Sequence, residues 1–136
     1  MIYRLPGTGP ARGISIFGRV IGAPSEGNMI EFYWDGGFTF TGLSAERPDD
    51  ILGIGLAYTG VSSKTSAFQK SMGDTIIADF EAMLEVSYTA QIVPGFTIQA
   101  VFQYFWNPGG HVPDPVDPAK AVPDAVVLGL RTTINY

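Results

Sequence analysis

Carboxylate, amide and guanidinium side chains recur at even spacing in this sequence, which would place them on one face of extended strands. The set consists of Glu31, Asp35, Glu81, Glu85, Gln99, Gln103 and Arg131. Paired carboxylates can serve a glycosidase, but that reaction needs a closed cleft around the bond to be cleaved, and nothing in the sequence indicates one. Two interpretations stay open: these groups line a water-filled lumen, or they are surface charges and framework ion pairs.

Other motifs that could carry chemistry are incomplete. The glycine-rich stretches at residues 7–13 and 53–55 lack both dinucleotide and phosphate-loop spacing. The single histidine, His111, has no partner for a catalytic triad or a convincing metal site, and the chain has no cysteine. Asp114, Asp117 and Asp124 lack the glycine and the terminal glutamate of a calcium loop. The sequence therefore predicts no catalytic residue, no cofactor and no metal.

The composition restricts the fold and the partners. Of 136 residues, 46% are hydrophobic and only 15% are charged, whereas soluble domains average about 25% charged residues. The 17 glycines and 10 prolines interrupt the chain too often for a helical bundle. No apolar run approaches the ~20 residues of a membrane-spanning helix. A net charge of −5 argues against nucleic acid as a partner.

Six segments alternate apolar and polar side chains with the period of a β-strand. They cover residues 12–21, 30–42, 51–61, 81–92, 96–106 and 125–136. Soluble strands commonly have ~5 to 6 residues, whereas a tilted strand needs ~9 to 11 to cross a bilayer. The length of the segments therefore favours an all-β protein whose strands span a membrane.

Each strand would have one apolar and one polar face. In 96–106, for example, Ile98, Ala100 and Phe102 alternate with Gln99 and Gln103. A soluble ligand-binding barrel with an apolar interior would show the same alternation and is the alternative. Aromatic residues near the strand ends favour the membrane barrel, because such barrels have aromatic girdles at both interfaces.

The connections alternate in length along the chain. Residues 62–80 and 107–124 form long polar connections, whereas 43–50 and 93–95 are short. Outer-membrane barrels have short periplasmic turns and longer external loops. We therefore expect 6–11, 43–50 and 93–95 to be periplasmic, and 22–29 to be a shorter external loop.

Several motifs, in this order, resemble the carbohydrate-selective porins of the OprB family in Gram-negative outer membranes. They are the turn Arg47-Pro48-Asp49-Asp50 before residues 52–58, the stretch 85–91 before a proline turn, residues 99–104 before Asn107-Pro108-Gly109-Gly110, and the ending 128–136. The sequence departs from the family at Gly95, which precedes Phe96 where tryptophan is frequent, and at the terminal Tyr136, where phenylalanine is usual.

The resemblance implies a sixteen-stranded transmembrane barrel for passive sugar diffusion, with residues 1–136 as the C-terminal part of its single domain. A signal peptide and the N-terminal strands are then expected upstream of Met1. Barrel geometry agrees, because six or seven strands would close a backbone cylinder only ~12 to 14 Å across, whereas sixteen give ~30 Å. The expected partners are sugars, outer-membrane lipid and the missing strands, and homo-oligomerisation is left open. A small complete barrel of eight strands is a third hypothesis.

Overall fold

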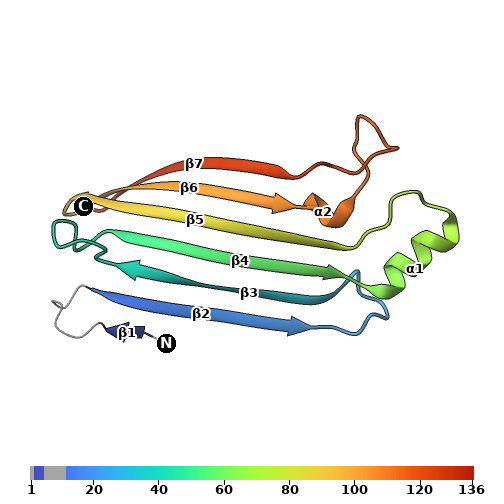
Figure 1. Ribbon diagram of the computed structural model, residues 1–136, viewed down its shortest axis with the longest axis horizontal. Coiled ribbons are helices and arrows are strands. Elements are labelled where there is room, and N and C mark those ends of the chain that lie inside the picture. Colours follow the sequence, from blue (N-terminus) through green and yellow to red (C-terminus); the bar gives the residue numbers. More distant parts are fainter. Residues whose placement is uncertain (1, 5–11) are drawn as a thin grey trace.

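The computed structural model describes residues 2–4 and 12–136. They form one antiparallel sheet of seven strands, and two helices lie in the connections between strands. The strands lie side by side in chain order (Figure 1). They are β1 (Ile2–Arg4), β2 (Gly13–Gly22), β3 (Ile30–Thr41), β4 (Ile51–Val61), β5 (Phe80–Val93), β6 (Phe96–Trp106) and β7 (Ala125–Ile134). The all-β prediction is confirmed, and each of the six predicted segments corresponds to one strand. The short β1 is additional, and the predicted turn at 6–11 lies outside the described residues.

The pairing register gives the sheet two chemically different faces. Even-numbered residues pair with even-numbered residues across β2 to β7, and odd-numbered residues pair with odd, except at the irregularities beside Ile30 and Val93. Because side chains alternate along a strand, one face carries all the even positions and the other all the odd positions. Central rows of the even face are apolar, for example Ile16, Phe38, Ile54, Val86, Phe102 and Leu128. We call these the apolar face and the polar face.

The sheet is a single layer without a hydrophobic interior. No hydrophobic side chain is buried in the described part of the chain, and Leu128 and Leu130 are 77% and 75% exposed. A folded soluble domain covers such a face with a second layer. The apolar face here has no cover from the described residues, and the sheet does not enclose the apolar interior that the soluble-barrel alternative requires.

The two ends of the sheet differ in their connections. The β3–β4 connection and the tight β5–β6 turn lie at one end, whereas the β2–β3 connection, the two longest connections and both helices lie at the other (Figure 1). We call these the short-turn end and the long-loop end. None of the helices in the described ranges has the length and apolar character needed to cross a membrane.

The long connection at 62–80 contains a helix that the sequence analysis did not predict, α1 (Ser63–Met72). Its first turn is capped by the Ser62 hydroxyl, which accepts a hydrogen bond from Lys64 N at 3.3 Å. It ends at Gly73, which adopts the left-handed conformation and donates to the carbonyls of Gln69 and Lys70. Capping residues thus define this helix, whose weak amphipathic pattern gives no clear periodic signal. The other long connection contains the one-turn α2 (Pro108–His111).

Candidate functional site: the polar face of the sheet

The structure places six of the seven predicted site residues on the polar face. They are Asp35 on β3, Glu81 and Glu85 on β5, Gln99 and Gln103 on β6, and Arg131 on β7. The seventh, Glu31, lies at an irregularity in the β3–β4 pairing, between Ile30 and Phe32. The register therefore brings polar groups from four strands, β3, β5, β6 and β7, onto one surface.

A hydrogen-bonded pair and a neighbouring amide–guanidinium pair occupy the β5–β7 part of this face. Gln103 Nε2 donates to Glu85 Oε2 at 2.6 Å. Gln99 pairs in register with Arg131, one strand further along the sheet. Together these four side chains offer carboxylate acceptors, amide donors and acceptors, and guanidinium donors. Such a mixture can both donate hydrogen bonds to hydroxyl groups and accept hydrogen bonds from them.

An ion pair on the polar face includes a residue, Arg19, that the sequence analysis did not predict. Arg19 Nε donates to Asp35 Oδ1 at 2.8 Å, and Arg19 Nη2 donates to the Tyr33 hydroxyl at 3.3 Å. The guanidinium carbon also lies 5.2 Å from the centre of the Tyr33 ring. Arg19 occupies an odd position in the predicted segment 12–21. Assigning the odd positions of that segment to the polar face would therefore have identified Arg19 as a site residue.

Two of the predicted carboxylates hold the long loops. Glu31 Oε2 accepts hydrogen bonds from Ser63 N at 3.1 Å and Ser63 Oγ at 3.2 Å, at the start of α1. Glu81 Oε2 accepts a bond from Gly109 N at 2.6 Å, inside α2. These side chains therefore position the loops at the long-loop end.

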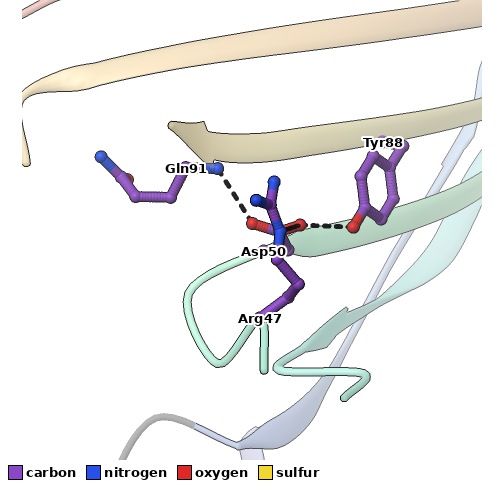
Figure 2. A network of polar contacts seen from close by, with 4 residues as sticks. All are labelled: Arg47, Asp50, Tyr88 and Gln91. Carbon is purple, nitrogen blue, oxygen red and sulfur yellow. Dashed lines mark hydrogen bonds and ion pairs between the residues drawn. The ribbon is translucent and has the colours of Figure 1, made fainter. Parts of the chain in front are cut away.

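A buried carboxylate at the opposite end ties the β3–β4 connection to β5. Asp50 is only 1% exposed, and its carboxylate accepts hydrogen bonds from the Tyr88 hydroxyl and from Gln91 N, the latter at 2.9 Å (Figure 2). Arg47 Nε lies 2.8 Å from Asp50 Oδ2. Because Tyr88 and Gln91 are 38 and 41 residues distant in sequence, spacing alone could not predict this cluster.

These contacts give a pH dependence with a defined sign. The hydrogen bond from Tyr88, assisted by Arg47 and Gln91 N, lowers the pKa of Asp50, although burial acts in the opposite direction. A depressed folded-state pKa stabilises the fold above the ordinary aspartate pKa of about 3.9, and this contribution is lost as the pH falls through the folded value.

We therefore expect Asp50→Asn to lower the urea midpoint of the full-length protein at pH 7, and the difference from wild type to shrink at pH 3. Asp50→Ala should be worse at pH 7, because it removes the carboxylate that accepts the part-buried hydrogen bonds of Arg47, Tyr88 and Gln91 N. Unfolding followed by tryptophan fluorescence at both pH values measures this. The exposed neighbour Asp49 is the control, and an equal loss in Asp49→Asn would contradict the assigned role of Asp50.

Comparison with known proteins agrees with this arrangement. The high-pH structure of Pseudomonas putida OprB matches the fold with a TM-score of 0.74 at 21% sequence identity. The match covers 91% of this chain and 30% of that one, so the chain spans less than a third of that structure. No curated protein matches. The sequence model described as carbohydrate-selective porin, OprB family, matches residues 1–136. Because this match extends over the whole sequence, the chain belongs to the OprB family of carbohydrate-selective porins.

Proposed function

We propose that this chain forms the C-terminal part of an outer-membrane barrel through which sugars diffuse passively. The observation that carries the proposal is the separation of the sheet into an apolar face and a face that carries the charged and amide side chains of β2, β3, β5, β6 and β7. Lipid would cover the apolar face, and water in the lumen would cover the polar face. The family match supports carbohydrate as the solute class. Strands outside this chain would close the barrel between β7 and β1.

The polar face provides the chemistry that passive sugar diffusion needs. Sugars are neutral and carry many hydroxyl groups, which both donate and accept hydrogen bonds. The amide, carboxylate and guanidinium groups of Asp35, Glu85, Gln99, Gln103 and Arg131 supply both kinds of partner. In a wet lumen, water competes for each of these bonds, so the contacts orient a sugar without retaining it.

The two ends of the sheet give the proposed orientation. We assign the short-turn end, with the Asp50 cluster, to the periplasm and the long-loop end to the exterior, as in other outer-membrane barrels. Glu31 and Glu81 would then lie at the external mouth, where their bonds to Ser63 and Gly109 hold the loops.

Cysteine substitution in the full-length protein tests both the lumen and the function. The chain has no cysteine of its own. Gln99→Cys lies on the polar face and its neighbour Ile98→Cys on the apolar face of the same strand. In vesicles, a bulky charged thiol reagent should label position 99 and leave position 98 unlabelled. Labelling at 99 should also slow the sugar-driven swelling of the vesicles.

The matched control is the same Gln99→Cys protein before labelling, against which the slowing of vesicle swelling by the reagent is measured. Equal labelling at 98 and 99 would overturn the face assignment. If the wild-type protein conducts ions but does not admit sugars, sugar transport is excluded.

A further inference from the structure

Phe17 is an aromatic side chain on the polar face, which also carries Tyr33 and Phe105 nearer the long-loop end. Phe17, on β2, occupies an odd position and pairs with Gly37 on β3, which in turn pairs with Gly55 on β4. The side chain is 53% exposed. It is therefore an apolar group on the face that we assign to water, and no second layer of the described chain covers it.

The two glycines give the phenyl ring its position. A Cβ atom added at Gly37 would lie 3.0 Å from Phe17 Cζ, and one added at Gly55 would lie 3.9 Å from the same atom. The ring thus extends from β2 across β3 towards β4, over backbone that carries no side chain. An added Cβ at Gly37 would also collide with the Ile54 carbonyl, so glycine is required there.

Polar groups surround this ring on the same face. The row that contains Phe17, Gly37 and Gly55 continues to the hydrogen-bonded Glu85 and Gln103. Neighbouring strands are ~4.8 Å apart, so Glu85 lies one strand beyond Gly55. In the adjacent row, towards the long-loop end, Arg19 and Asp35 form their ion pair.

We propose that Phe17 is a stacking platform for the ring of a pyranose sugar in the lumen, an inference that rests on the proposed function. A pyranose presents an apolar C–H surface on its ring face and hydroxyl groups around its edge. The C–H surface would lie on the phenyl ring and remove apolar area from water. The edge hydroxyls would then reach Glu85 and Gln103 on one side and the Arg19–Asp35 pair on another. The site selects cyclic sugars over open-chain polyols of similar size.

Glucose block of the ion current through the full-length porin in a planar bilayer measures this site. D-Glucose is the cyclic probe, and mannitol is the open-chain probe. We expect Phe17→Ala to raise the half-blocking concentration of glucose about three- to tenfold, the range expected from losing one aromatic contact. Phe17→Tyr keeps the flat ring and should stay near wild type. Mannitol block should be the same in all the variants.

Val101→Ala is the matched control, because Val101 is also apolar and lies on the polar face. It should leave glucose block unchanged. If Phe17→Ala does not assemble, Phe17→Leu keeps apolar volume without a flat ring and should lose glucose block to the same extent.

Three results would overturn the proposal. The first is a glucose block that stays unchanged in Phe17→Ala or in Phe17→Leu. If the block is unchanged and the variant is also less stable, another segment of the barrel covers the ring. The second is an equal change in mannitol block. In both cases, glucose-driven swelling with the wild type would leave the proposed function standing. The third is a wild type that conducts ions and admits no glucose, which refutes the transport function and this site with it.

Discussion

Expressed without further strands, the 136-residue chain is expected to give no heat-resistant folded monomer in detergent. Within the described residues the sheet is open, with β1 and β7 at its edges. Each backbone group left unpaired in hydrocarbon costs several kcal/mol, and β7 alone presents one edge of ten residues. Closing these edges on each other would give a cylinder only ~12 to 14 Å across, too narrow for a hydrated lumen.

Migration in SDS gels before and after boiling measures this outcome. The full-length protein should migrate as a compact species until it is boiled, whereas the 136-residue chain should migrate identically in both samples. Planar-bilayer recordings of the same chain should show no channels. Folded, channel-forming material from these residues alone would favour a self-contained or oligomeric barrel instead.

The strands could be predicted from the sequence because one local rule governs them. A strand whose two faces meet different environments requires alternation at every second residue, so the pattern in 96–106 identifies β6 with its observed bounds. Face assignment follows from the same parity, which is why Gln99 and Gln103 fall on the polar face. The number of strands in a complete barrel is implied by the family resemblance alone, because no local pattern contains it.

The features that could not be predicted depend on contacts between distant segments. Asp50 is buried only because β5 brings Tyr88 and Gln91 to it. The position of Phe17 depends on glycines from two other strands, and a phenylalanine in an alternating segment is normally assigned to the apolar side. Glu31 follows the expected parity, but the pairing irregularity beside it and its bond to Ser63 are properties of the folded loop.

A charge on the apolar face near mid-strand should strongly destabilise the full-length barrel in lipid vesicles. Phe102 lies near the centre of β6, in a row with Val86 and Leu128. We expect Phe102→Arg to lower the free energy of unfolding by ~2 to 4 kcal/mol, because the guanidinium would enter the hydrocarbon near the bilayer midplane. Urea unfolding in the vesicles, followed by tryptophan fluorescence, measures this loss.

Two further substitutions on the same strand separate a membrane environment from a dry protein interior. Val101→Arg introduces the same charge on the polar face, opposite Gly129, and should change stability by no more than about 0.5 kcal/mol, as at other water-exposed positions. Ile98→Arg lies on the apolar face closer to the short-turn end and should cost less than Phe102→Arg, because the penalty in a bilayer falls towards the interface. Equal losses at 98 and 102 would indicate a uniformly apolar interior, and an equal loss at 101 would show that the polar face does not meet water.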